Sequence, residues 1–280
     1  MKNLKQTTNI DNKVVEDFGR EWKRFNHKEI DDSVLDSSFK DYFDIFPLHQ
    51  LGDAEGFDMG CGSGRWAKFV SPHVKLLHCI DPSNEALEQA KSNLDQTTNC
   101  DFECSSVDVC SLENSSQDFG YSLGVLHHIP DTLEALKSCA SKLKPGAPFL
   151  LYLYYRFDNK PKWYALIWKL SDFLRKIIAN LPYPLKFFTS QVIAFTIYFP
   201  LAKIARLLEL CRLNVSNIPL SEYRSKSLYM MRTDALDRFG TRLEQRFTKA
   251  EITKMLADTG FENITFSDHA PFWVSLAYKK

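Results

Sequence analysis

Apolar and polar positions along this chain alternate in blocks that predict an α/β fold. Short, nearly continuous apolar runs are separated by segments with apolar residues at helical spacing. The clearest helix opens at 130–132 and places Leu133, Leu136, Ala140 and Leu143 on one face. The predicted strands lie at 56–58, 74–81, 100–109, 119–126 and 147–155, with two more between 261 and 278. Strands that alternate with helices favour a mainly parallel sheet with buried strands.

The last helix is predicted from its terminal signals. Thr248 and Glu251 have the spacing of a capping box, in which each side chain accepts a hydrogen bond from the other residue's backbone. Gly260 is placed to end that helix, because glycine readily adopts the left-handed conformation of a C-terminal cap. The two strands after Gly260 are therefore the last elements of the sheet.

Three glycines occupy every second position directly behind the first predicted strand. Gly60, Gly62 and Gly64 follow Asp58, and glycine lets a strand-to-helix turn bring backbone amides close to a ligand. A dinucleotide fingerprint has the spacing G-x-G-x-x-G, but its third glycine, counted from Gly60, would fall at Arg65. The turn therefore predicts a nucleoside-bearing ligand and disfavours an NAD-type oxidoreductase.

A second carboxylate ends the next strand. Asp81 follows Asp58 by 23 positions, which is the length of one strand-helix-strand unit. A carboxylate at this place can accept two hydrogen bonds from the vicinal hydroxyls of a ribose. The alternative is a structural role at the start of the following helix, since 81–83 also has capping chemistry. Asp81 is the strongest single candidate for a binding residue.

Two motifs carry a resemblance to a known family. The pattern D-x-G-x-G-x-G at 58–64 resembles the first motif of class I S-adenosylmethionine-dependent methyltransferases. The sequence GVLHHIPD at 124–131 is similar to the motif after strand four in the ubiquinone and menaquinone C-methylating enzymes. The resemblance covers roughly 50–155 and 235–280. It implies a Rossmann-like seven-stranded sheet with helices on both faces and an antiparallel last strand.

The resemblance also implies S-adenosylmethionine as cofactor and assigns residues to it. Asp58 would hold the ammonium group, Asp81 the ribose, and Asp108 with the backbone amide of Val109 the adenine. An exposed turn is the alternative for Asp108. The predicted cofactor-binding residues are Asp58, Gly60, Cys61, Gly62, Gly64, Asp81, Pro82, Asp108, Val109 and Gly124. Residues 18–25 look like a front helix folded over the cofactor, where Trp22 either stacks on the ligand or anchors the core.

Methyl transfer from a sulfonium mainly requires positioning of the acceptor and exclusion of water. A base is needed where the acceptor is a hydroxyl or a carbon acid, and His127 and His128 are the best-placed candidates. The alternative for each histidine is packing beneath the helix that follows. Weaker candidates are Tyr154, Tyr155, Tyr223 and Tyr229.

The region between the fifth strand and the last helix has a different composition. Residues 156–212 contain ten basic and three acidic residues, a net charge of +7, although the whole chain has a net charge of zero. No glycine occurs between Gly146 and Gly240, which favours helices. The predicted domains are an N-terminal helical cap at 1–50, a cofactor-binding core at 51–155 and 232–280, and a helical insertion or lid at 156–231.

Within this insertion, 187–202 is a run of sixteen uncharged residues between Lys186 and Lys203. The run is shorter than the roughly 20 residues that span a bilayer, and Pro200 is expected to interrupt it. Two interpretations remain, a buried helix of a substrate lid and an interfacial surface for a membrane or a lipid-like substrate. Nucleic acid is not expected, because the basic residues alternate with large aliphatic ones.

Composition limits the remaining choices. Seven cysteines without a C-x-x-C pair argue for reduced thiols and against a zinc site, so no metal is expected. The first 26 residues lack an apolar core of a signal peptide, which predicts a cytoplasmic protein, either free or peripheral to the inner face of the membrane. The sequence thus predicts a methyltransferase that O- or C-methylates a small, hydrophobic or lipid-linked metabolite. The alternative is an inactive cofactor-binding or scaffolding protein docked at a membrane.

Overall fold

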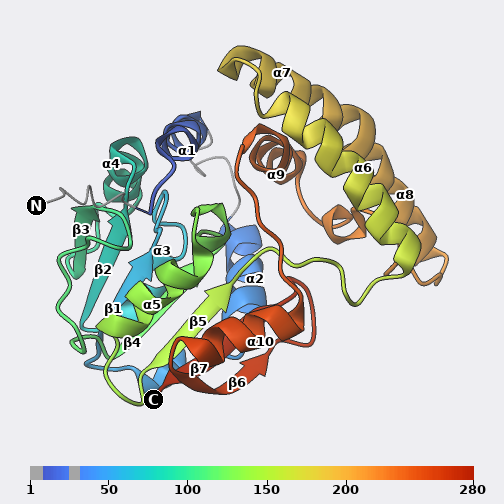
Figure 1. Cartoon of the computed structure of the whole chain (residues 1–280). Coiled ribbons are helices and arrows are strands. Elements are labelled where there is room, and N and C mark those ends of the chain that lie inside the picture. The colour runs from blue at the N-terminus through green and yellow to red at the C-terminus, as the bar shows by residue number, and fades with distance from the viewer. Residues whose placement is uncertain (1–8, 25–31) are drawn as a thin grey trace, which may run out of the picture. The chain divides into compact units, whose positions relative to one another are not determined.

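The computed structural model describes residues 9–24 and 32–280 (Figure 1), so part of the predicted front helix, Phe25, lies outside the described residues. The described chain divides into two compact units. The core unit comprises 9–24, 36–155 and 245–280, and the insertion unit comprises 156–244 together with 32–35. The sequence predicted an N-terminal cap at 1–50 and an insertion at 156–231, whereas the compact units group 9–24 and 36–50 with the core and extend the insertion to Glu244.

The core unit contains a seven-stranded sheet with the order β3-β2-β1-β4-β5-β7-β6. Its strands are β1 (Glu55–Met59), β2 (Leu76–Asp81), β3 (Cys100–Cys104), β4 (Phe119–Leu123), β5 (Pro148–Tyr152), β6 (Phe261–Phe266) and β7 (Val274–Lys279). The first five strands are parallel, whereas β7 is antiparallel to both β5 and β6. This confirms the expected sheet with an antiparallel last strand.

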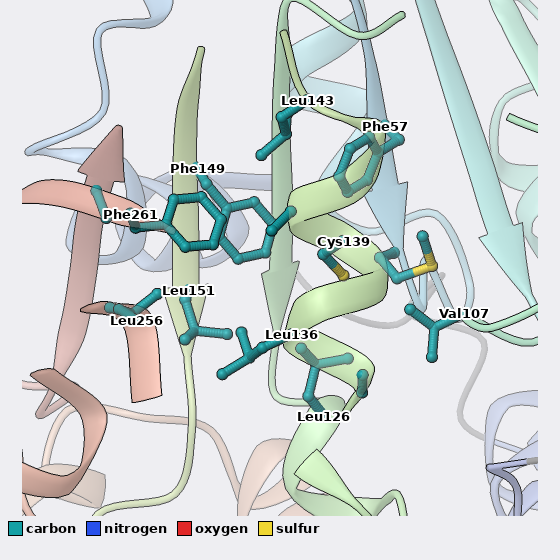
Figure 2. Packing of buried hydrophobic residues seen from close by; sticks show 14 of the residues in the cluster. Phe57, Val107, Leu126, Leu136, Cys139, Leu143, Phe149, Leu151, Leu256 and Phe261 are labelled. Carbon is teal, nitrogen blue, oxygen red and sulfur yellow. The ribbon is translucent and has the colours of Figure 1, made fainter. Parts of the chain in front are cut away.

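Helices cover both faces of this sheet because its central strands are apolar on both sides. The core unit contains α1 (Asn12–Arg24), most of α2 (Asp32–Phe43), α3 (Ala67–Val70), α4 (Asn84–Asn93), α5 (Thr132–Lys142) and α10 (Lys249–Asp258). Helices α5 and α10 cover one face, where Leu136 packs with Phe149 and Phe261 (Figure 2). The opposite face packs Phe43 and Trp66 against Tyr121. The capping box of Thr248 and Glu251 forms as predicted.

The third strand is shorter than its sequence suggests. It ends at Cys104, where the Ser105 amide makes a last hydrogen bond of 3.2 Å to the Asp81 carbonyl. The chain then turns, and the Val109 amide donates to the Ser106 carbonyl at 3.2 Å. Asp108 is consequently an exposed turn residue and does not end a strand.

The insertion unit is helical, as its lack of glycine predicts. It consists of α6 (Lys162–Ile178), α7 (Tyr183–Ile193), α8 (Phe199–Leu210) and α9 (Leu228–Gly240), with a π-turn at Ala194–Tyr198 between α7 and α8. Helix α9 packs against both α6 and α7, which also contact each other. Its inward side chains, such as Met231 and Phe239, form the apolar core of this unit with Ala194 and Tyr198. Because α9 completes that core, it groups with the insertion unit.

Helices α7 and α8 join through the π-turn into one helix of 28 residues, Tyr183–Leu210. The sequence predicted a shorter apolar segment interrupted at Pro200. The π-turn removes the interruption, because the Phe199 amide donates to Ala194 and Pro200 then lies in the first turn of α8, where no backbone donor is needed. By length and composition alone this helix could cross a membrane, and 28% of its most apolar window is buried inside the protein.

Candidate cofactor-binding site

The glycine turn after β1 is held against the end of β2. The amides of Gly60 and Cys61 both donate to the Ile80 carbonyl, at 2.7 and 3.0 Å. Gly60 has a φ of +81°, and a Cβ there would lie 2.4 Å from the Val125 side chain. A larger residue at this position would therefore clash as well as strain the backbone.

The next glycine of the turn lies beneath helix α1. A Cβ built on Gly62 would be 3.1 Å from the ring of Trp22, so this indole covers the turn. Helix α1 also packs on α4, and a Cβ on Gly19 would lie 2.5 Å from the Ser83 hydroxyl. The described part of the predicted front helix thus lies over the glycine turn.

Asp81 lies at the end of β2 and is buried. Its Oδ2 accepts the Gly62 amide and its Oδ1 accepts the Ser83 amide, each at 2.9 Å. Ser83 itself caps α4, since its hydroxyl accepts the Ala86 amide at 3.3 Å. Burial raises the pKa of Asp81 to about 6, although the two amides oppose that shift. The carboxylate therefore fixes the glycine turn and still has lone pairs for a ligand.

Asp58 is even more enclosed, with 1% of its surface exposed. Its Oδ2 makes no hydrogen bond of ordinary length with any described residue, although the Tyr121 hydroxyl is near enough to lower its pKa. Burial outweighs that effect and raises the pKa of Asp58 to about 8, and the nearby Asp81 acts in the same direction. A ligand cation placed beside Asp58 would reverse the shift and bring back the charged carboxylate.

The residues predicted for the adenine have partners within the chain. Asp108 accepts the Ser106 hydroxyl at 2.6 Å and the Asn9 amide at 3.1 Å. The Val109 amide is part of the turn described above, and its side chain is exposed. Their contact with adenine stays a prediction, and it would require a ligand to share or replace these hydrogen bonds.

The histidine pair follows β4 in a short 3-10 turn, Leu126–His128, and both side chains are buried. The ring of His127 lies 4.0 Å from that of His128 and 3.9 Å from that of Tyr154, between centroids. Neither ring nitrogen of His127 has a hydrogen-bond partner among the described residues. Burial, reinforced by His128 and Arg246, lowers the pKa of His127 well below its ordinary value. This geometry favours the packing alternative for His127, and a role as base stays a prediction.

Two residues missed by the sequence analysis hold this cluster. The Gln245 amide donates to the His127 carbonyl at 3.0 Å, and its side chain donates to the Ile129 carbonyl at 2.7 Å. The guanidinium of Arg246 lies 5.1 Å from the centre of the Tyr154 ring. The sequence offered a signal for Arg246 alone, as a charged residue directly before the apolar Phe247 and the capping box.

The other predicted residues fall in two places. Cys61, Gly64, Pro82 and Gly124 belong to the loops after β1, β2 and β4, at the same edge of the sheet as Asp58 and Asp81. Tyr223 and Tyr229 lie in the insertion unit, whereas Tyr154 and Tyr155 follow β5. Within 9–24 and 32–280 no group of three or more histidine, cysteine, aspartate or glutamate side chains could hold a metal ion.

The arrangement fits S-adenosylmethionine. Asp58 offers a buried acidic group to an ammonium, and Asp81 offers a buried acceptor to ribose hydroxyls. Gly124 has a φ of +79°, and a Cβ added there would meet nothing within 4 Å, which leaves room at the exit of β4. All three residues lie at the carboxyl ends of adjacent parallel strands, where open α/β sheets bind their ligands.

Part of the chain is similar to known proteins. Residues 57–151 match the family described as methyltransferase domain. The chain is 30% identical over 123 residues to a ubiquinone biosynthesis O-methyltransferase of Vibrio vulnificus, covering 40% of this chain and 52% of that one. A protein of the same name from Coxiella burnetii is 26% identical over 121 residues, covering 38% and 52%. The chain thus spans about half the length of the curated relatives it matches.

Solved structures share the fold at low sequence identity. A methyltransferase of Haloferax volcanii, solved with the Trm112 methyltransferase activator, superposes with a TM-score of 0.53 at 13% identity and covers 93% of this chain and 96% of its own. An S-adenosylmethionine-dependent methyltransferase of Thermotoga maritima gives a TM-score of 0.50 at 14% identity, with coverage of 94% and 100%. Residues 57–151 thus match a methyltransferase domain family, and the chain shares its fold with solved methyltransferases, for which this fold and domain imply S-adenosylmethionine as the cofactor.

Proposed function

We propose that the chain transfers a methyl group from S-adenosylmethionine to the oxygen or carbon of a small, hydrophobic or lipid-linked acceptor. The observation that carries this proposal is the pair of buried carboxyl groups, Asp58 and Asp81, around the glycine turn. S-adenosylmethionine combines an ammonium group with the vicinal hydroxyls of a ribose, and its sulfonium supplies an electrophilic methyl group.

The residues of the chain act mainly by positioning. Asp81 fixes the turn through the Gly62 amide and accepts from the ribose. Asp58 orients the amino acid part of the cofactor, and Trp22 covers the turn and limits the access of water. An acceptor with a poorly acidic hydroxyl or carbon needs a base, and His128 and Tyr154 are the titratable groups next to His127.

The nature of the acceptor is supported by two observations. The curated relatives carry a name that refers to ubiquinone biosynthesis and to O-methylation, but the match spans only about half of each of them. The insertion unit of this chain carries many exposed aliphatic and aromatic side chains, which suits an apolar acceptor. We therefore favour a phenol or carbon acid attached to an apolar chain.

Cofactor binding is tested by titration calorimetry with S-adenosylmethionine and S-adenosylhomocysteine. Asp81→Ala should weaken both ligands by about 2 to 3 kcal/mol, roughly 30- to 150-fold, the scale of hydrogen bonds to a charged group. Asp101→Ala is the matched control, because Asp101 is an exposed aspartate on the adjacent strand β3 and should leave both affinities unchanged. Unchanged affinity in Asp81→Ala, or tighter binding of NAD by the wild type, would contradict the assignment.

The second candidate is an inactive cofactor-binding protein, and the enclosed His127 favours it. Turnover distinguishes the two: the wild type is incubated with S-adenosylmethionine and alkylated phenols or catechols, and S-adenosylhomocysteine is quantified. Transfer to any of these acceptors supports the enzyme. Tight cofactor binding without transfer to any of them would support the inactive protein.

A further inference from the structure

Helix α6 presents an apolar stripe to solvent. Its exposed large hydrophobic side chains recur at helical spacing and are Trp163, Leu166, Ile167, Leu170, Phe173, Leu174 and Ile177. Leu166 is 70% exposed and Leu170 is 66% exposed. Residues spaced by three and four positions lie on one side of a helix, so these seven side chains form a continuous surface, here named the α6 stripe.

Three lysines run along one edge of the α6 stripe. Lys162, Lys169 and Lys176 are spaced by seven residues, so they lie in one row, and all three are exposed. The only acidic residue of α6, Asp172, lies next to this row and is largely buried, where it pairs with Arg175 at 2.7 Å and with Lys176 at 3.0 Å. The solvent-facing side of α6 therefore combines apolar side chains with a row of lysines, of which Lys176 is paired with Asp172.

The polar side of α6 points into the protein. Arg175 is only 3% exposed, and its guanidinium donates to the Thr241 carbonyl at 2.9 Å. Ser171 accepts a hydrogen bond of 3.3 Å from Arg238 of α9. These buried contacts fix the orientation of the helix, because turning the α6 stripe inward would break them and expose unpaired polar groups. The buried polar contacts of α6 therefore keep the α6 stripe exposed to solvent.

The long helix α7–α8 also exposes apolar side chains. Its exposed side chains include Leu185, Phe188, Val192, Phe195, Leu207 and Leu210. Among the described residues, every exposed large hydrophobic side chain except Val109 lies between Trp163 and Leu213. Lys203 and Arg206 in the middle of α8 are exposed as well. Apolar area of this extent marks an interaction surface and not an ordinary solvated face.

We propose that the α6 stripe and its lysine row dock in the plane of an anionic lipid bilayer. An interfacial helix buries its apolar side chains at the level of the acyl chains while flanking lysines reach the headgroups, and this is the arrangement of α6. The charge complementarity selects an anionic membrane over a neutral one. The proposal is independent of the methyl-transfer reaction.

Docking in the plane fits the structure better than a span across the bilayer. One side of α7–α8 packs on α9, where Gln191 accepts a 2.6 Å hydrogen bond from Arg232. If Tyr183–Leu210 crossed the membrane, α9 with its arginines and aspartates would have to enter the hydrocarbon beside it. In the in-plane arrangement these groups stay on the aqueous side.

The test is flotation of the full-length protein with vesicles of phosphatidylcholine alone or with roughly a third phosphatidylglycerol. The wild type should float with the anionic vesicles at low salt and less at high salt, because salt screens headgroup attraction within about 10 Å at 0.1 M. Neutralising Lys162, Lys169 and Lys176 to Gln should weaken binding by at least about 25-fold, at roughly fivefold for each of Lys162 and Lys169 and less for Lys176, which is already paired with Asp172. Arg175 keeps its side chain in this variant, because it is buried and orients α6.

Two further variants separate the contributions. Lys91→Gln, Lys137→Gln and Lys254→Gln together remove the same charge from exposed positions of the core unit and should bind like the wild type. Replacing Leu166, Leu170 and Phe173 by Gln should reduce binding to both vesicles at least tenfold while unfolding stays at the wild-type temperature. Equal binding by all variants would overturn the proposal, and so would a wild type that stays soluble at low salt. A dimer that the Gln substitutions dissociate, without vesicle binding, would assign the stripe to a second copy.

Discussion

Helices α5 and α6 have similar amphipathic patterns, but α5 buries its apolar side and α6 exposes its apolar side. Helix α5 buries Leu136 and Ala140 against the sheet and exposes Lys137, whereas α6 buries Arg175 and exposes Leu170. In the core unit, burial of apolar surface stabilises the fold. In the insertion unit, a polar network orients the helix and leaves its apolar side outside. Periodicity therefore identifies a stripe but does not say whether the stripe faces the protein.

The largest expected effect is on stability, in matched leucine variants of the buried side of α5 and the exposed side of α6. Leu136→Ala should lower the free energy of unfolding by about 2 to 5 kcal/mol, because it removes a fully buried side chain and leaves a cavity. Leu170→Ala should change it by less than about 0.5 kcal/mol, because that side chain is in water. Denaturant titration of both variants gives the values. A comparable loss in Leu170→Ala would show that the α6 stripe is covered in solution.

The second prediction concerns the buried acid of the core unit. Because the pKa of Asp58 is raised to about 8, the carboxyl is neutral below that pH, and a cationic ligand must release its proton to pair with it. Affinity for S-adenosylmethionine should therefore rise up to tenfold per pH unit, or up to about 100-fold from pH 6 to pH 8, and then level. Calorimetry in buffers of different ionisation enthalpy measures the released proton.

Asp58→Asn is the control for this pH dependence. The amide cannot titrate, so most of the slope between pH 6 and pH 8 should disappear while the protein stays folded. A slope that persists in Asp58→Asn would assign the titration to another group, of which Asp81 is the nearest candidate. A flat profile in the wild type would contradict the raised pKa itself.

Much of the sheet could be predicted because its central strands are buried on both faces. The strands β1, β4 and β5 appear in the sequence as short apolar runs, and the spacing of Asp58 and Asp81 places both at neighbouring strand ends. The predicted end of β3, at 109 instead of Cys104, was wrong for a related reason. This strand lies at the edge of the sheet and is only partly buried, so its pattern has no clear end.

The remaining differences depend on contacts that local patterns do not contain. Pro200 suggested an interruption, but the preceding π-turn accommodates it within one helix. Gln245 reaches the His127 carbonyl across more than a hundred positions, and nothing near Gln245 in the sequence indicates this contact. The raised pKa of Asp58 also comes from burial, which the turn motif alone does not give. Motifs thus indicate a candidate site, and the electrostatics of that site depend on tertiary packing.

The smallest expected effect is at His127, where the two interpretations give opposite results. If the ring packs between His128 and Tyr154, His127→Phe should keep cofactor affinity and turnover within about threefold, because an aromatic ring of similar shape fills the same space. His127→Ala should instead lower the melting temperature by leaving a cavity. A base would behave differently: both variants would lose about 10² to 10⁴ in turnover with cofactor affinity unchanged. Steady-state rates measured beside calorimetry and thermal melts therefore decide whether this buried imidazole belongs with the core side chains or with the catalytic groups.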